Sequence, residues 1–196
     1  MRRIVVSEFV SLDGIMEDPG GAESYEHGGW AFKFDRGAEG DTFKLDEVME
    51  AEAMLLGRVT YEGFAQAWPS RTDEAGFADK MNSMGKFVVS NTLTAPEWNN
   101  STVISGDVPA RVAELKAQPG GDLLVAGSAQ LVHTLTEHDL VDEYRLMVFP
   151  IVLGHGKRVF KDGAGSHSLE LVETRQTGSV VLLTLHPKRA LKETAG

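Results

Sequence analysis

Residues 123–138 read LLVAGSAQLVHTLTEH, a short apolar run, a turn of small residues and an amphipathic stretch in direct succession. Leu131, Val132 and Leu135 recur at the spacing of one helical face. The run before them lacks alternation, which is typical of a strand covered on both faces. We therefore predict a strand, a tight turn and a helix, the unit from which parallel α/β sheets are built.

Similar units flank this segment on both sides. Apolar runs bounded by turn residues predict further strands at 4–10, 53–56, 87–90, 103–105 and 144–149. Helical patterns fall at 109–118, at 128–138 and at 41–51, where Phe43, Leu45, Val48 and Met49 lie near one face. This alternation predicts an α/β fold with a mostly parallel central sheet and helices on both faces.

The C-terminal end changes character. Residues 169–175 and 180–186 are strand-like, and Thr177-Gly178-Ser179 between them is a turn signal. We expect an antiparallel hairpin added to the sheet. On this interpretation residues 1–187 are a single domain, and residues 188–196 form a polar C-terminal tail.

The composition limits the classes of function. The chain has 196 residues, a formal net charge of -10 and no cysteine. The negative charge argues against nucleic acid, whose phosphates need a basic surface, and against a polybasic membrane anchor. The absence of cysteine excludes disulfides, thiolate nucleophiles and iron–sulfur clusters. No stretch approaches the roughly 20 apolar residues of a membrane span. We expect a cytoplasmic protein with neither nucleic acid nor membrane as a partner.

The segment after the strand at 53–56 offers a first binding feature. Gly57 ends the strand, and a helix starts near Thr60. The free N–H groups at a helix start bind anions, and a glycine allows close approach. Arg58 can pair with a phosphate through its forked guanidinium. Taken alone, the segment is better explained as a capped helix with a surface arginine.

Gly127, Ser128 and Ala129 form a second turn of this kind. Small residues leave room for a diphosphate at the helix N-terminus. The full G-x-G-x-x-G pattern is absent, however. A tight turn capped by Ser128 explains the segment equally well.

Two further turns carry short polar side chains. Ser90 and Asn91 can hydrogen-bond a ribose phosphate, although ordinary turn chemistry is the simpler explanation. Asp13 follows the first strand, where open α/β sheets place ligands, and an Asp-Gly turn with Gly14 explains it equally well. In a parallel sheet all four turns open at one edge, where a single anionic ligand can use them together.

Over residues 2–187 the chain resembles the reductase domain of bifunctional riboflavin-biosynthesis deaminase–reductases and its stand-alone relatives. The resemblance is carried by the ordered set Ser11-Leu12-Asp13-Gly14, Gly57-Arg58-Val59-Thr60-Tyr61, residues 86–92, residues 120–131 and Pro150-Ile151-Val152-Leu153-Gly154. That group has the dihydrofolate reductase-like three-layer fold, which we therefore expect here.

The resemblance implies NADPH as the cofactor. It places Gly57, Arg58 and Thr60 at the cofactor phosphates, Ser90 and Asn91 by the adenosine ribose and its 2′-phosphate, and Gly127, Ser128, Ala129 and Gln130 around the diphosphate. On the substrate side it implies Gly14, Pro150, Leu153, Gly154 and the loop through Trp30. It also implies a homodimer.

The expected activity is that of an NADPH-dependent reductase that transfers hydride to a small heterocyclic or carbonyl substrate. Such a reaction needs a source of protons. We assign that role first to Asp13 and second to Glu17, through an ordered water, because an ionised aspartate is a poor acid near pH 7.

Two alternatives stay open. One is the 5-amino-6-(5-phosphoribosylamino)uracil reductase of riboflavin biosynthesis, and the other is a non-catalytic nucleotide-binding protein of the same fold. We expect no metal, because the six histidines show no H-E-x-x-H spacing.

Overall fold

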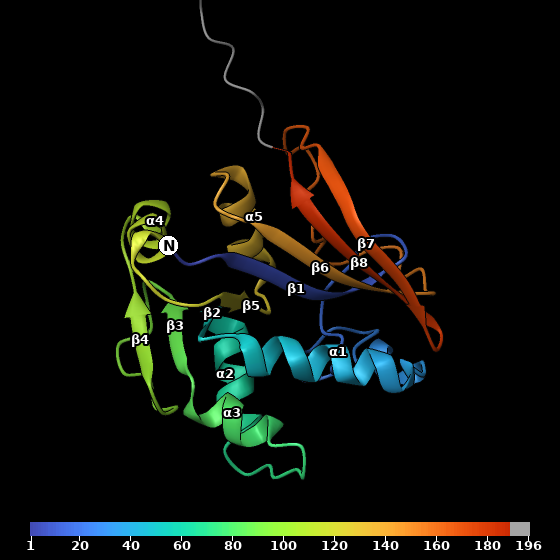
Figure 1. The fold of residues 1–196 in the computed structure, drawn as a ribbon, viewed down its shortest axis with the longest axis horizontal. Helices are drawn as coiled ribbons and strands as arrows, with labels where there is room; N and C mark the ends of the chain where they lie inside the picture. Colours follow the sequence, from blue (N-terminus) through green and yellow to red (C-terminus); the bar gives the residue numbers. More distant parts are fainter. Residues whose placement is uncertain (189–196) are drawn as a thin grey trace, which may run out of the picture.

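The computed structural model of the chain describes residues 1–188, and eight strands form one sheet in the order β4-β3-β2-β5-β1-β6-β8-β7 (Figure 1). Strands β1 to β6 run parallel, β8 is antiparallel to β6, and β7 is antiparallel to β8. The mostly parallel sheet and the C-terminal hairpin are thus confirmed. The strands are β1 (Ile4–Ser11), β2 (Ala53–Gly57), β3 (Gly85–Val89), β4 (Ser101–Ile104), β5 (Leu123–Val125), β6 (Glu143–Phe149), β7 (Leu169–Thr177) and β8 (Val180–Pro187).

Helices cover both faces of the sheet, as predicted. Successive residues of β1 point to opposite faces, so Ile4 and Val6 pack into the core under α4 and α5, whereas Val5 packs into the core under α1, α2 and α3. The helices are α1 (Gly37–Glu50), α2 (Arg58–Ala67), α3 (Phe77–Ser83), α4 (Val108–Ala117) and α5 (Ala129–Glu137), with a short 3-10 helix η1 (Trp30–Lys33).

The observed helices differ from the prediction: α1 begins at Gly37 and not at residue 41, η1 and α3 are additional, and α1 buries a residue that the pattern did not select. Helix α3 was not predicted from the sequence, because its seven residues are too few for a clear apolar period. On α1 the buried neighbour of Val48 is Glu47, while Met49 is 41% exposed. The pattern placed Met49 in the core because it is apolar, but the helix turns Glu47 toward a polar partner on β1.

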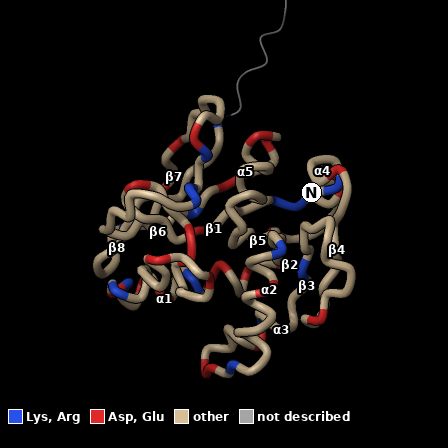
Figure 2. The backbone as a smooth tube through the Cα atoms, turned by 180° about the vertical axis from the view of Figure 1, so that it is seen from behind, with Lys and Arg blue, Asp and Glu red and all other residues tan. Residues whose placement is uncertain are grey.

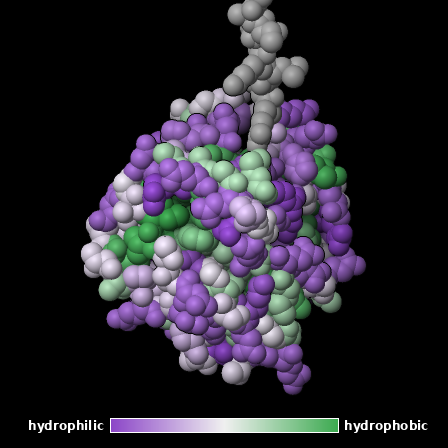
Figure 3. Space-filling view, turned by 60° about the vertical axis from the view of Figure 1, so that its left-hand side comes forward, coloured by the Kyte–Doolittle hydropathy of each residue, from purple (hydrophilic) through white to green (hydrophobic). Residues whose placement is uncertain are grey.

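The face seen in Figure 3 is mostly hydrophilic, with a limited apolar area on it. Within residues 1–188, no helix combines the length and the apolar character needed to cross a membrane. The tail predicted for residues 188–196 lies outside the described residues, apart from Lys188.

Candidate active site

The turns singled out in the sequence share one edge of the sheet. Because β1, β2, β3, β5 and β6 are parallel, the residues that follow each of them emerge at the same side. We call this side the carboxyl edge. Strand β5 pairs with β1 only through residues 4–6 of β1, so the second half of β1 continues past the end of β5.

At the carboxyl edge the turn after β2 touches the turn after β5. The backbone N–H of Gly57 donates to the carbonyl oxygen of Gly127 at 3.2 Å. A Cβ atom on Gly57 would lie 2.2 Å from Ser128 Oγ, and one on Gly127 would lie 2.7 Å from Thr60 Oγ1. Gly127 also has a φ of 90°, and the peptide bond from Gly127 to Ser128 is cis. This close approach requires glycine at both positions.

The two helices that start at these turns lack side-chain caps. Gly57 is the N-cap of α2 and Ser128 is the N-cap of α5, and neither side chain accepts a hydrogen bond from its helix. A turn capped by the Ser128 hydroxyl was the alternative explanation of this segment, but that hydroxyl does not cap α5. The first N–H groups of each helix are available to an anion.

The remaining residues of the two helix starts differ in exposure. Arg58 is the first residue of α2, and its guanidinium is exposed and pairs with Glu62 at 2.7 Å. Ala129 and Gln130 open α5, where Ala129 is buried and Gln130 is exposed. Arg58 and Gln130 thus have side chains that a ligand at the carboxyl edge can reach.

Ser90 and Asn91 follow β3 and form hydrogen bonds within the turn. Ser90 Oγ accepts from the backbone N–H groups of Thr92 and Leu93, at 3.1 and 2.9 Å. Asn91 Oδ1 accepts from the backbone N–H of Gly106 at 2.9 Å. The Asn91 amide nitrogen forms no hydrogen bond within residues 1–188, and Asn91 is exposed.

Asp13 joins the loop after β1 to the loop after β6. Its carboxylate accepts hydrogen bonds from Ser11 Oγ at 2.6 Å, from Leu153 N at 3.1 Å and from Gly154 N at 2.8 Å. Partial burial favours the neutral acid, but these hydrogen bonds outweigh it and lower the pKa of Asp13 to about 2. Asp13 is therefore a carboxylate at neutral pH, and its geometry suits positioning of the loop better than proton delivery.

Glu17 is held by the same loop. It forms an ion pair with Lys157 Nζ at 2.7 Å and accepts a hydrogen bond from Lys157 N at 2.9 Å. Burial opposes ionisation, but the contacts with Lys157 dominate and the pKa of Glu17 is lowered. Like Asp13, Glu17 is an ionised side chain engaged in holding two loops together.

The residues expected on the substrate side are partly buried. Gly14 has a φ of 86° and accepts a hydrogen bond from Val159 N, while Pro150 and Gly154 are exposed. Leu153 belongs to a buried cluster with Trp30.

Trp30 has no exposed surface. Its Nε1 donates to the carbonyl oxygen of Glu17 at 2.8 Å, and its ring packs edge-on against Phe149 at 5.3 Å. In this structure Trp30 is therefore a packing residue with no ring surface left for a substrate, which corrects the expectation for this side chain.

Glu8 is a functional candidate that the sequence reasoning missed. It lies on the second half of β1, is 8% exposed, and its Oε1 has no hydrogen-bond partner. Burial raises the pKa of Glu8 to about 8, against the attraction of Lys44 and a hydrogen bond from the Gly127 backbone. Glu8 is thus a protonated carboxyl at neutral pH beside the turn at Gly127, a combination typical of functional sites.

A polar cluster of Ser7, Lys44 and Glu47 lies on the other face of β1, and Ser7 is next to Glu8 in the sequence. Ser7 Oγ donates to the Glu47 carboxylate at 2.7 Å, and Lys44 Nζ donates to Ser7 Oγ at 3.0 Å and pairs with Glu47. In Figure 2 the acidic segment of β1 lies close to acidic and basic segments of α1. One signal for this site was present in the sequence, since Ser7 and Glu8 are polar residues inside an otherwise apolar strand.

A hollow of about 490 Å³ lies elsewhere, between α1 and the strands β6, β7 and β8. Charged side chains of both signs line it, among them Glu47, Arg145 and Arg175. None of the glycine turns contributes to it, so the candidate site is the carboxyl edge and not this hollow.

Comparison with known proteins identifies one family model that covers nearly the whole chain. The family model of the RibD C-terminal domain matches residues 2–183. The chain is 31% identical over 189 residues to "Uncharacterized protein YyaP" of Bacillus subtilis (strain 168), covering 94% of this chain and 95% of that protein.

Solved structures show the same fold. A protein from Shewanella sp. PV-4, whose assignment to riboflavin biosynthesis is provisional, matches with a TM-score of 0.73 and 24% identity, covering 95% of this chain and 99% of that chain. RibD of Acinetobacter baumannii matches with a TM-score of 0.63 and 16% identity, covering 96% of this chain and 58% of that longer chain. The dihydrofolate reductase-like fold expected from the sequence is confirmed.

Proposed function

Because this chain belongs to the RibD C-terminal domain family, we propose that it is an NADPH-dependent oxidoreductase that transfers hydride to a small heterocyclic or carbonyl substrate. The observation that carries the proposal is the meeting of the starts of α2 and α5 at Gly57 and Gly127, with no side-chain cap on either helix. Free N–H groups from two adjacent helix starts suit the diphosphate of a dinucleotide.

Glycine at the two meeting turns supports the assignment of NADPH to the carboxyl edge. A Cβ atom on Gly57 would lie 2.2 Å from Ser128 Oγ and one on Gly127 would lie 2.7 Å from Thr60 Oγ1, so glycine at both positions lets the two helix starts pack close enough for one ligand to reach both. In our assignment Gly57, Thr60, Gly127, Ser128, Ala129 and Gln130 hold the diphosphate, Ser90 and Asn91 contact the adenosine ribose, and Arg58 binds the 2′-phosphate. The bound cofactor supplies the hydride. The chain supplies the position of the substrate and the proton.

We assign proton delivery to Glu8. A reduction of a C=N or C=O group needs a proton at the receiving atom, and a donor must be protonated at the working pH. Glu8 meets this condition because its buried carboxyl has a pKa of about 8 and a free Oε1. Asp13 and Glu17 then position the two loops beside the site, and their low pKa values keep them ionised.

The cofactor assignment is tested by thermal shift with NADPH and NADH. A ligand at about 100 times its Kd stabilises the folded state by about 2.7 kcal/mol, which a melting curve detects. We expect a larger shift with NADPH than with NADH, and Arg58→Ala should narrow that difference. Arg111→Ala is the matched control, because Arg111 is also an exposed arginine that pairs with an exposed glutamate, Glu114, on its own helix.

Three outcomes are informative. No shift with either nucleotide contradicts the proposed cofactor. A cofactor preference that Arg58→Ala leaves unchanged removes Arg58 from 2′-phosphate recognition. Equal effects of Arg58→Ala and Arg111→Ala would show that surface charge alone is responsible.

The riboflavin-pathway pyrimidine reductase is the second candidate, since the family match and the fold both lie in that group. The basic residues that could grip a ribityl phosphate are already engaged, however. Lys157 pairs with Glu17 and Glu23, and Arg158 donates to the Asp13 carbonyl oxygen. Assays of NADPH oxidation with phosphorylated and unphosphorylated pyrimidines separate the two candidates. Binding of NADPH without oxidation by any substrate would favour the third, non-catalytic alternative.

We also propose that the chain forms a homodimer. Strand β7 is the last strand of the sheet, and the exposed side chains of Leu171 and Val172 lie on it at 54% and 52% exposure. An exposed edge strand with apolar side chains is a favourable place for pairing between chains. Light scattering after size exclusion gives the mass, and Leu171→Lys should shift a dimer toward the monomer.

A further inference from the structure

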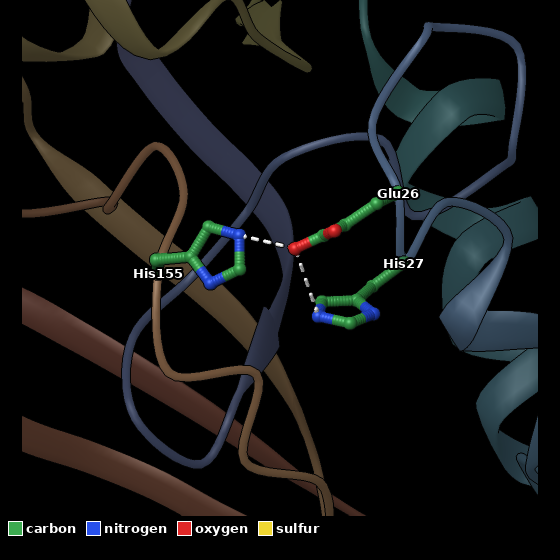
Figure 4. A group of neighbouring side chains, drawn as sticks. All are labelled: Glu26, His27 and His155. Atoms are coloured by element: carbon green, nitrogen blue, oxygen red, sulfur yellow. Dashed lines mark ion pairs between the residues drawn. The ribbon is translucent and has the colours of Figure 1, made fainter.

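Glu26, His27 and His155 form a cluster separate from the residues assigned to the cofactor (Figure 4). Glu26 and His27 lie in the glycine-rich loop 18–29, and His155 lies in the loop after β6. Both imidazoles direct Nε2 at the same oxygen, Oε1 of Glu26, at 2.6 Å from His155 and 3.4 Å from His27. We propose that these three side chains bind one divalent transition-metal ion and that the ion links the two loops. Zn²⁺ is the ion used below to compare distances and to test the site.

The spacing of the ligand atoms fits such an ion. Zinc binds imidazole nitrogen and carboxylate oxygen at about 2.0–2.2 Å, so two ligands of a tetrahedral ion lie about 3.3 Å apart. The distance from His27 Nε2 to Glu26 Oε1 is 3.4 Å. One ligand atom from each residue lies within 4.8 Å of the others. To reach about 3.3 Å, His155 Nε2 must move away from Glu26 Oε1 by less than about 1 Å, and the two imidazole nitrogens, which lie within 4.8 Å of each other, must approach that same separation.

The chemistry of the ligand set is also suitable. Two imidazoles and one carboxylate are a ligand set of open zinc sites, in which water or another molecule takes the fourth position. The side chains of Glu26 and His155 are each 63% exposed and that of His27 is 43% exposed, so an ion can enter from solvent.

Tyr25 holds the two imidazoles in place. Its hydroxyl donates to the His155 carbonyl oxygen at 2.6 Å. Its ring packs edge-on against His27 at 5.4 Å and against His155 at 5.9 Å, and the two imidazoles lie 5.4 Å apart. Such supporting contacts orient metal ligands before the ion arrives, which lowers the entropic cost of binding.

Glu26 has no lysine or arginine partner among residues 1–188. Lys157, the neighbouring cation, pairs with Glu17 and Glu23. Within residues 1–188, the ion pairs of Glu26 are with His27 and His155. When both imidazoles are neutral, which is the form that binds metal, the carboxylate has no full positive charge opposite it. A divalent ion would supply that charge.

The site escaped the sequence reasoning for a geometric reason. His155 is remote in sequence from Glu26 and His27, so no short metal-binding pattern joins them. Only the packing of the glycine-rich loop against the loop after β6 places the third ligand beside the first two.

Isothermal titration of the tag-free, EDTA-treated chain with ZnCl₂ tests the proposal. We expect one saturable site in the wild type, and at least a tenfold loss of affinity in His27→Ala, Glu26→Gln and His155→Ala. His133→Ala and His138→Ala are matched controls, because these histidines lie outside the cluster, and should bind as the wild type does. Circular dichroism establishes that each variant is folded.

Hydrogen exchange provides a second readout that does not depend on activity. Zn²⁺ should slow exchange in peptides from residues 18–29 and 150–158 of the wild type, and should have no such effect in His27→Ala/His155→Ala. Absence of a saturable site would overturn the proposal. So would Zn²⁺ binding that the double variant retains, or slowed exchange that does not include these two loops.

Discussion

Replacing Glu8 with glutamine removes the ionisable group from the buried carboxyl on β1 and keeps the size of the side chain. In the wild type this carboxyl is 8% exposed and its Oε1 is unpartnered. Ionising it costs free energy because water is excluded, and Lys44 and the Gly127 backbone offset only part of that cost. The substitution therefore separates the effect of the buried charge from that of packing.

The sign follows from the direction of the pKa change. The pKa of Glu8 rises from an ordinary 4.5 to about 8 on folding, so the native state binds this proton more tightly than the unfolded state. The resulting stabilisation is fully present below pH 4.5 and is lost as the pH rises through about 8. The difference of about 3.5 pH units, at about 1.4 kcal/mol each, corresponds to about 5 kcal/mol as an upper bound.

Urea denaturation at about pH 5, 7 and 9 measures this effect. We expect the stability of Glu8→Gln relative to the wild type to increase from pH 5 to pH 9 by about 2–5 kcal/mol. Glu170→Gln, an exposed glutamate on strand β7, should show no such trend. A difference between Glu8→Gln and wild type that does not change with pH would refute a raised pKa, and with it the assignment of Glu8 as the protonated group. The same variant should lower the rate of substrate reduction about 100-fold or more.

Three further predictions test other parts of the site. Gly57→Ala should lower the free energy of unfolding, measured with urea, by about 1–3 kcal/mol and abolish the NADPH-induced thermal shift, because the added Cβ would lie 2.2 Å from Ser128 Oγ. Gly63→Ala is the control on α2, where an added Cβ would meet no atom within 4 Å, and it should have neither effect. Asp13→Asn should make the melting temperature fall less steeply in acid than that of the wild type. The pKa of Asp13 is lowered to about 2, so the carboxylate stabilises the folded state above its ordinary pKa of 3.8 and this stabilisation is lost as the pH falls toward 2. A melting temperature that falls equally steeply in the variant would contradict this. Lys86→Met should lower the free energy of unfolding by about 2 kcal/mol or more, since the buried ammonium donates to three backbone carbonyls; a loss under about 0.5 kcal/mol would show that those carbonyls find other donors.

The amino-acid sequence by itself determined the strands, most of the helices and the fold class. Apolar runs without alternation predicted β2 and β5, and the turn signal at Gly178 predicted the hairpin of β7 and β8. Local patterns suffice for these features because they depend on residues close together in the chain. The order of small-residue turns also identified Gly57 and Gly127 as positions where a helix start needs space.

The tertiary structure decided what each polar side chain does. Asp13 and Glu17 accept hydrogen bonds from a loop more than a hundred residues away, and this contact joins the loop after β1 to the loop after β6. Glu8 becomes a protonated carboxyl only because folding excludes water from it. Its pKa, like the convergence of two remote histidines on Glu26, depends on distances across the fold, and distances of that kind are not contained in any local pattern.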